Sequence, residues 1–387
     1  MYFTACSVEP LKPVTIDATA PRADYLDDVK PILDRRCVVC HSCYNSPCQL
    51  KLSSFEGLDR GASKDKVYLA ERLSAQDPSR LFMDAKSTQE WREKGFTSVS
   101  DSDSEDGTNN SLMLLLLEHK MQNVKSVGDY YSESDDLTCA KDRDELASFL
   151  DKNPQSGMPF GFPPLSESEF ETIKTWLAQG AQSPSKAQME SIKSASKIAQ
   201  KQINEFEEFL NIEDAKHIMS ARYIYEHLFL AHIAFEGASG EFFELVRSKT
   251  PSPDAIDIIA TIRPYDDPEV DKFYYRFRKI HSTIVHKTHI VYDMSYKKLQ
   301  RYRELFIEPE WNEAPFVVDY KDLPDFFDML HNYDGSMWYK YKFAKFAVFR
   351  GDDNFWRTYD WFQDKFFESN PKEAGLFDLN RYYHRAF

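Results

Sequence analysis

The stretch Cys37-Val38-Val39-Cys40-His41 decides how this chain is interpreted. Two residues separate its cysteines and a histidine follows at once, which is the spacing of covalent c-type haem attachment. In that chemistry two thiolates add to the porphyrin vinyl groups and the imidazole binds the iron. Residues three apart on a helical turn share a face, so Cys37 and Cys40 both reach the ring edge while His41 points at the metal.

Three other interpretations of these five residues stay open. A thioredoxin-like dithiol needs no following histidine and is expected in a βαβ setting, and a zinc site is expected to have a second ligand pair at similar spacing. The third alternative is chance. We predict covalent haem c attached through Cys37 and Cys40, with His41 as an iron ligand.

A second segment, Gly157-Met158-Pro159-Phe160-Gly161-Phe162-Pro163-Pro164-Leu165, supplies what a haem still lacks, a sixth ligand. Pro159 favours an extended Met158, and the surrounding glycines and prolines exclude a helix, so the thioether lies on a loop. The usual alternative is a gap-filling core methionine. We expect Met158 to bind iron. The replacements, if it does not, are Met113, Met121 and His119.

Helical patterns flank both segments. Apolar residues recur at helical spacing from Leu26 to Leu33, before the cysteines. After the loop, Ser166 and Glu169 have the spacing of a capping box, and Gly180 ends the helix that they begin. A helix leading into the cysteines, a Met-Pro loop and a closing helix resemble a class I cytochrome c fold. We predict a mainly α protein, in which a cytochrome c-like domain precedes a mixed, mostly helical second domain.

The predicted domains are an N-terminal tail over residues 1–19, a haem domain over 20–183 and a second domain over 184–387. The boundary is placed at Ala181-Gln182-Ser183-Pro184-Ser185, a small and polar stretch.

In the second domain, we predict a long connecting helix from Ile192 to Leu210 and a buried helix over 213–235. A strand is predicted from Ser282 to Tyr292, where β-branched residues gather.

Composition narrows the class of protein. The 387 residues include 63 acidic and 48 basic side chains, and the formal charge of −15 argues against a nucleic-acid partner. The longest apolar run, Leu112 to Leu117, is far shorter than the roughly 20 residues that span a bilayer, so we interpret it as a core helix. We expect a soluble or peripherally bound protein.

Covalent haem and six cysteines both indicate an oxidising compartment, which we expect to be a bacterial-type periplasm. Residues 1–6 have no basic start and no apolar stretch, so we expect a processed form or a start site placed too late. Phe3-Thr4-Ala5-Cys6 has the form of the end of a lipoprotein cleavage site, which makes Cys6 a candidate lipid anchor. A disulfide or a free thiol are the alternatives for Cys6.

The connectivity of the remaining cysteines stays open. Cys43 and Cys48 lie in a turn-rich loop that can close on itself as a disulfide, and Cys139 is an alternative partner for either of them.

The stretch from Lys272 to Arg303 is rich in lysine and arginine, with tyrosines and Phe273 interleaved and few acids. Such a surface can bind lipid phosphates while its aromatic rings enter the membrane interface. The alternative is a surface whose charge is balanced by acidic neighbours in the fold.

Several longer segments carry a family resemblance. They run in order from about residue 25 to about residue 306. These segments are Arg36–Tyr44, Pro47–Gly57, Glu90–Phe96, the Met158 loop, Tyr225–His232, Ile262–Pro268 and Thr283–His289. Together they resemble the bacterial fatty acid cis/trans isomerases.

The resemblance implies a periplasmic c-type haem enzyme that converts cis double bonds of unsaturated fatty acids, free or in phospholipids, to trans. The straighter chains counter fluidisation of the membrane. If His41 and Met158 both stay bound, the iron has no open position. Either Met158 leaves, or the electron moves outer-sphere, or a thiyl radical at Cys43 or Cys48 adds reversibly to the double bond. A Cys43–Cys48 disulfide would exclude the third route.

Two other functions remain open for the same residues. An electron-transfer cytochrome c with a docking domain would leave lipids unchanged. A haem-based sensor would use loss of Met158 from the iron to switch the second domain.

Overall fold

The computed structural model describes residues 11–17, 19–42, 46–65, 68–69, 72–73, 77–104, 107–124, 139–140, 142–285, 291–308 and 320. The chain divides into two compact units. Unit 1 contains Met1–Ser191 together with Ser282–Thr288, and unit 2 contains Ile192–His281 together with His289–Phe387. The division therefore follows Ser191, whereas the sequence places it after residue 183.

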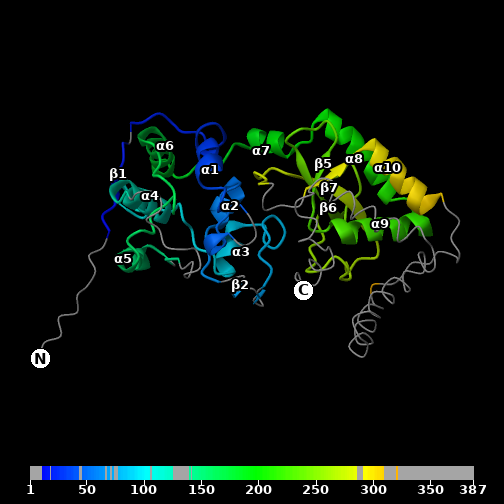
Figure 1. Cartoon of the computed structure of the whole chain (residues 1–387), viewed down its shortest axis with the longest axis horizontal. Coiled ribbons are helices and arrows are strands. Elements are labelled where there is room, and N and C mark those ends of the chain that lie inside the picture. The colour runs from blue at the N-terminus through cyan, green and yellow to red at the C-terminus, as the bar shows by residue number, and fades with distance from the viewer. Residues whose placement is uncertain are drawn as a thin grey trace, which may run out of the picture. The chain divides into compact units, whose positions relative to one another are not determined.

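Unit 1 consists mainly of short helices, which carry the blue to green colours of its part of Figure 1. A π-helical turn, Tyr25–Val29, leads directly into the first α-helix, and Pro47–Gln49 form a 3-10 turn. The α-helices are α1 (Lys30–Arg36), α2 (Phe55–Arg60), α3 (Thr88–Glu93), α4 (Leu112–Gln122), α5 (Arg143–Lys152), α6 (Glu167–Ala178) and α7 (Lys186–Lys193), of which α7 crosses the division. The strands are two antiparallel pairs, β1 (Val14–Thr15) with β4 (Thr108–Asn109) and β2 (Tyr68–Leu69) with β3 (Arg72–Leu73).

The core of unit 1 lies between the helices that flank the two predicted haem segments. Leu33 of α1, Leu114 of α4 and Trp176 of α6 are fully buried in one apolar cluster. Helix α6 begins with the predicted capping box, in which the Ser166 and Glu169 side chains each accept a backbone N–H. The predicted helices before the cysteines and after the Met158 loop are both confirmed, as is the core helix over Leu112 to Leu117.

Unit 2 contains a four-stranded sheet in the order β7-β6-β5-β8. Strand β5 is antiparallel to β6 and parallel to β8, and β6 is antiparallel to β7. The strands are β5 (His232–Phe235), β6 (Phe242–Ser248), β7 (Tyr274–Ile280) and β8 (Val291–Met294). The helices are α8 (Lys197–Leu210), α9 (Ala215–Leu228) and α10 (Tyr296–Tyr302), and α10 continues into a π-helical turn, Arg303–Ile307.

The helices of unit 2 pack on the sheet through aromatic side chains. Phe206 of α8 contacts the rings of Phe235 on β5, Phe277 on β7 and Tyr302 on α10, with ring centroids 5.9, 6.1 and 6.2 Å away. All four side chains are buried in a single cluster that joins α8, α9, α10 and the sheet. This layer of rings forms the hydrophobic core of the unit.

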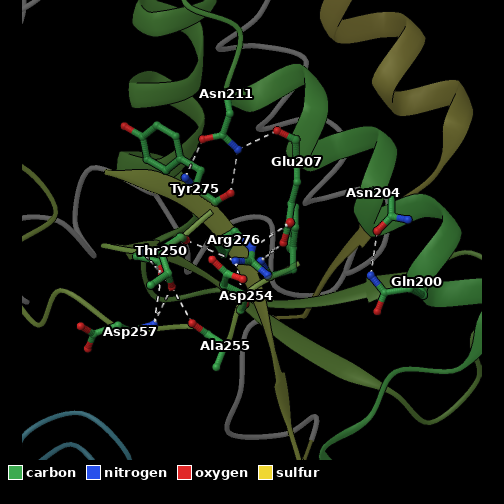
Figure 2. Close-up of polar contacts among 12 residues, drawn as sticks. Gln200, Asn204, Glu207, Asn211, Thr250, Asp254, Ala255, Asp257, Tyr275 and Arg276 are labelled. Carbon is green, nitrogen blue, oxygen red and sulfur yellow. Dashed lines mark hydrogen bonds and ion pairs between the residues drawn. The ribbon is translucent and has the colours of Figure 1, made fainter. Parts of the chain in front are cut away.

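The outer edge of β7 is covered by the Glu207 side chain of α8 and by that of Asn211, the residue that follows α8 (Figure 2). Asn211 Oδ1 accepts from Tyr275 N across 2.9 Å and Asn211 Nδ2 donates to Tyr275 O across 3.0 Å, while Phe277 N donates to Glu207 Oε1 across 2.8 Å. Glu207 also holds the buried Arg276 guanidinium at 2.9 Å. Two side chains one helical turn apart therefore take the place of a neighbouring strand, which protects the edge from pairing with another chain.

The predicted fold class, a mainly α protein, is wrong. The chain is mixed α/β, because unit 2 is built around the sheet and strands β6 and β7 were not predicted. Strand β6 reads Phe-Phe-Glu-Leu-Val-Arg-Ser and is buried on both faces toward its end, so it lacks the alternation of a half-buried strand. Strand β7 was not recognised in the sequence because it contains charged residues, of which Arg276 and Arg278 form ion pairs.

Three predicted elements are corrected. The long helix from Ile192 to Leu210 is two helices, because Ser196 caps the start of α8. The helix over 213–235 ends at Leu228 and is followed by β5. The predicted strand from Ser282 to Tyr292 is not formed at residues 282–285, residues 286–290 lie outside the described residues, and β8 begins at Val291. Across the parts of the chain described above, no helix has both the length and the apolar character needed to cross a membrane.

Candidate functional site

The two haem-attachment cysteines lie on one turn at the end of α1. Cys37 follows the last helical residue, and the turn is closed by hydrogen bonds from Cys40 N and His41 N to Cys37 O, at 3.1 and 3.0 Å. Both cysteines carry thiols that are not in the disulfide, and Cys37 is half-buried whereas Cys40 is exposed. Burial raises the pKa of Cys37 to about 12, and the neighbouring Cys40 contributes in the same direction. The expected helical turn is therefore present, with both thiols unconsumed by a disulfide.

His41 is buried beside them, with only 8% of its surface exposed. Its Nδ1 lies 3.1 Å from the carbonyl oxygen of Leu50, and Leu52 N donates to His41 O across 2.7 Å. A carbonyl can only accept, so Nδ1 carries the hydrogen and Nε2 keeps its lone pair. Burial lowers the pKa of His41, which favours the neutral ring. A neutral imidazole whose second nitrogen binds a backbone carbonyl is the usual form of a metal-binding histidine.

A strained turn presents the Leu50 carbonyl to His41. Cys48 and Gln49 both have positive φ, 56° and 51°, in the left-handed region that non-glycine residues seldom adopt. Ser63 N donates to Cys48 O across 2.8 Å, Arg60 Nη2 donates to Gln49 O, and Ser79 Oγ donates to Gln49 Oε1 across 2.8 Å. Surrounding groups thus fix a backbone conformation that would be unfavourable alone.

Arg60 is a functional candidate that the sequence interpretation missed. Its side chain is 1% exposed, and its guanidinium carbon lies 5.4 and 4.7 Å from the ring centres of Trp91 and Phe96. Burial lowers its pKa to about 10. No acid forms an ion pair with it in the part of the chain that the structure describes. The available signal was weak, an arginine two residues after the buried Leu58 at the end of a short helix.

Cys48 forms a disulfide with Cys139, with their Cα atoms 6.1 Å apart. One of the pairings left open for Cys139 is therefore realised, and Cys48 has no free thiol with which to form a thiyl radical. Cys43 and Cys6 lie outside the described residues.

Met158 lies on a loop held by α4. Its backbone N donates to Leu116 O across 3.1 Å, and its half-buried side chain packs against the core cluster of unit 1, as does Cys37. A Cβ atom at Gly157 would lie 2.8 Å from Lys120 N, so only glycine permits this approach. The loop is confirmed, and the structure brings Met158 and Cys37 to the same cluster. That Met158 binds iron stays a prediction.

The replacement ligands have other surroundings. His119 Nε2 lies 2.8 Å from Pro154 O, Met113 is buried, and Met121 is half-buried at the margin of the core. The described segments contain no group of three or more His, Cys, Asp or Glu side chains that could hold a metal ion.

The basic stretch from Lys272 to Arg303 is largely balanced by acids in the fold. The ion pairs are Lys272–Glu213, Arg276–Glu207, Arg278–Glu244, Lys279–Glu241 and Arg301–Glu304. Lys298 donates to Asp293 O and lies over the ring of Tyr292. These contacts favour the balanced-surface alternative for most of the stretch. Membrane contact stays a prediction.

Comparison with known proteins identifies the family to which the chain belongs. The chain matches the sequence model described as fatty acid cis/trans isomerase over residues 76–321 and 313–384. The chain belongs to the fatty acid cis/trans isomerase family. It is therefore an isomerase whose family acts on fatty acids.

The match to the isomerase family begins after the Cys37–His41 motif, so membership does not depend on the motif. The match continues to residue 384, beyond the last segment that carried the resemblance. No curated protein and no solved structure matches the chain.

Proposed function

We propose that this chain is a haem c-dependent isomerase that converts cis double bonds of unsaturated acyl chains to trans. Cys37 and Cys40 would attach the haem, and His41 and Met158 would bind its iron. The observation that carries the proposal is the arrangement at the end of α1, where the thiols of Cys37 and Cys40 share a turn with a buried imidazole whose Nδ1 is hydrogen-bonded to Leu50 O. The donor set of two thiols, an imidazole nitrogen and a thioether suits haem c.

Isomerisation requires that the π-bond be weakened while the carbon–carbon axis turns. A haem bound here would supply a one-electron redox centre for that purpose. The side chains and backbone of the protein would orient the iron ligand and limit the access of water. The Leu50 carbonyl orients His41 so that Nε2 is the binding atom, and the apolar cluster beside Cys37 and Met158 limits the access of water.

The thiyl-radical route is the least favourable for Cys48, because its sulfur is bonded to Cys139 and would first have to be reduced. The same disulfide supports a periplasmic location, since such bonds persist in oxidising compartments. In that location the substrates are free fatty acids or phospholipid acyl chains, and the trans products stiffen the membrane under stress.

The experiment expresses the full chain, with a periplasmic leader, in a host that matures c-type cytochromes. The wild type is compared with the Cys37→Ser/Cys40→Ser variant by haem staining after denaturing electrophoresis and by gas chromatography of membrane fatty acids. Val39→Ala is the matched control, because Val39 is exposed and its replacement keeps both thiols and His41.

The wild type and Val39→Ala should show covalent haem and trans fatty acids, and the double variant should show neither. Trans fatty acids made by a double variant without covalent haem would overturn the haem dependence while leaving family membership intact.

A further inference from the structure

Arg247 is a buried cation that forms no ion pair with an acid among the described residues. It lies on β6 and is 0% exposed. Its Nη1 donates to Asp266 O across 3.0 Å and its Nη2 to Thr261 Oγ1 across 2.8 Å, whereas Nε has no hydrogen-bond partner. Within the described segments no carboxylate forms an ion pair with it. Buried charges are ordinarily paired, so this guanidinium requires an explanation.

Two neighbouring buried arginines show the ordinary pattern. Arg222 on α9 pairs with Glu226 at 2.8 Å, and Arg276 on the adjacent strand β7 pairs with Glu207 at 2.9 Å. Each of these pairs is neutral as a whole. Of these three arginines, Arg247 is therefore the one whose positive charge no described carboxylate neutralises. A single negative charge would neutralise it.

Aromatic rings surround this guanidinium. The ring centres of Tyr225, Phe273 and Tyr320 lie 5.2, 5.7 and 5.5 Å from its central carbon. Tyr275 is its cross-strand partner in the β6–β7 register. Burial raises the pKa of Tyr225 to about 12 and that of Tyr275 well above its ordinary value, so both phenols are neutral. The surroundings thus combine one cation with aromatic rings and phenol hydroxyl groups.

We propose that Arg247 binds the carboxylate of a free fatty acid, an inference that rests on the proposed action on unsaturated fatty acids. The free Nε and an adjacent Nη group form the planar fork that matches the two oxygens of a carboxylate. One carboxylate supplies the single missing charge, and the rings accept the first methylene groups of the chain.

Because the Arg247 side chain is buried, some lipid anions can reach it and others cannot. A carboxylate is the end of an acyl chain and can reach a buried cation. The phosphodiester of a phospholipid lies between a glycerol and a headgroup, and both would have to enter the protein. The Tyr320 ring, which lies 3.9 Å from the Arg222 guanidinium carbon and 5.5 Å from that of Arg247, belongs to the surroundings of this cation. The site therefore selects free acids over esters.

The test measures binding of oleic acid and of methyl oleate to the full chain, by displacement of a fluorescent fatty acid. The two probes differ at the carboxylate alone. The variants are Arg247→Gln and Arg247→Lys, with Arg276→Gln as the matched control, because Arg276 is a buried arginine of the same sheet that already has an acidic partner. Thermal unfolding accompanies each variant.

The wild type should bind oleic acid more tightly than methyl oleate. Arg247→Gln should weaken oleic acid binding about ten- to a hundredfold, the range expected for a hydrogen-bonded charge, and leave methyl oleate binding unchanged. Arg247→Lys should retain part of the preference, and Arg276→Gln should keep the ratio of the two affinities.

A wild type without preference for the acid would overturn the inference without recourse to any variant. Equal weakening of both probes in Arg247→Gln would also overturn it, because a structural arginine would produce that result. The assay requires no turnover, so its outcome is distinct from failure of the haem-dependent reaction.

Discussion

His41 and Leu50 are joined by a hydrogen bond of 3.1 Å, from the imidazole Nδ1 to the backbone carbonyl oxygen. Leu50 directly follows the left-handed pair Cys48 and Gln49, and the buried Arg60 binds the carbonyl of Gln49. The orientation of the proposed haem ligand thus depends on a strained turn that a cation from α2 holds in place.

Arg60 is therefore expected to act on the haem through His41. Arg60→Lys keeps the charge but cannot bind the carbonyls of Gln49 and Ser79 with a planar fork. We expect the free energy of unfolding to fall by about 1–3 kcal/mol, and the reduction potential of the haem-loaded protein to shift, because the Leu50 carbonyl moves. Denaturant unfolding and redox titration measure the two effects. Arg35→Gln, at a mostly exposed side chain, is the control. An unchanged potential would separate Arg60 from the site.

Met158→Ala tests the sixth ligand. If the thioether binds iron, its removal should eliminate the weak sulfur-to-iron absorption band of the ferric protein and permit exogenous ligands to bind. Met121→Ala is the matched control, since Met121 also lies half-buried beside the same core cluster. A ferric spectrum unaffected by Met158→Ala would transfer the role to Met113, Met121 or His119.

Part of the structure could be predicted because it depends on contacts between residues that lie close together in the sequence. The turn at Cys37 follows from residue spacing, and the capping box at Ser166 and Glu169 follows from two side chains three positions apart. In each case the partners that determine the conformation are near neighbours in the sequence. The sequence therefore sufficed for α1, α6 and the cysteine turn.

The rest of the structure could not be predicted, because it depends on contacts between residues that lie far apart in the sequence. The edge of β7 is completed by Glu207 and Asn211, which lie 70 and 64 positions from the backbone groups of Phe277 and Tyr275 that they bind. Arg247 is recognisable as a cation without an acidic partner among the described residues only when its neighbours on other elements are known. Pairing across such separations depends on the tertiary fold, which no periodicity within one element encodes.

Cys139→Ser should destabilise unit 1. The Cys48–Cys139 bond joins residues 91 positions apart, so it removes much conformational freedom from the unfolded chain, and its loss should cost about 2–5 kcal/mol. Denaturant unfolding measures the change. Reduction of the wild type should reproduce the effect of the variant, and Cys48→Ser should not add to it. Additive losses would show that the two cysteines act separately.

Lys297 provides the sharpest test of membrane contact. It is exposed on α10 and is not part of the ion pairs that balance the rest of the Lys272–Arg303 stretch. If this surface binds anionic lipid, Lys297→Glu should weaken sedimentation with vesicles that contain phosphatidylglycerol, and more so at low salt. Lys272→Glu is the control, because Lys272 is already paired with Glu213. Equal binding by the wild type and Lys297→Glu would assign Lys297 to an ordinary solvated surface.

The link between α1 and α6 should depend on pH through Glu169. Arg36, the residue before Cys37, donates to Glu169 from Nε at 3.0 Å and from Nη2 at 2.8 Å, and it is the main cause that lowers the pKa of Glu169 to about 2. In the unfolded chain that pKa is about 4.3. The carboxylate therefore contributes stability above about pH 4.3, and this contribution is lost as the pH falls through about 2.

Glu169→Gln should be less stable than the wild type at pH 7, and the difference should vanish near pH 2. Urea unfolding across that range measures it, with Glu171→Gln, at an exposed side chain of the same helix, as the control. A difference that persisted undiminished at pH 2 would assign the effect of Glu169 to packing, and the ionised link to Arg36 would then have no part in fixing the helix that presents the cysteines.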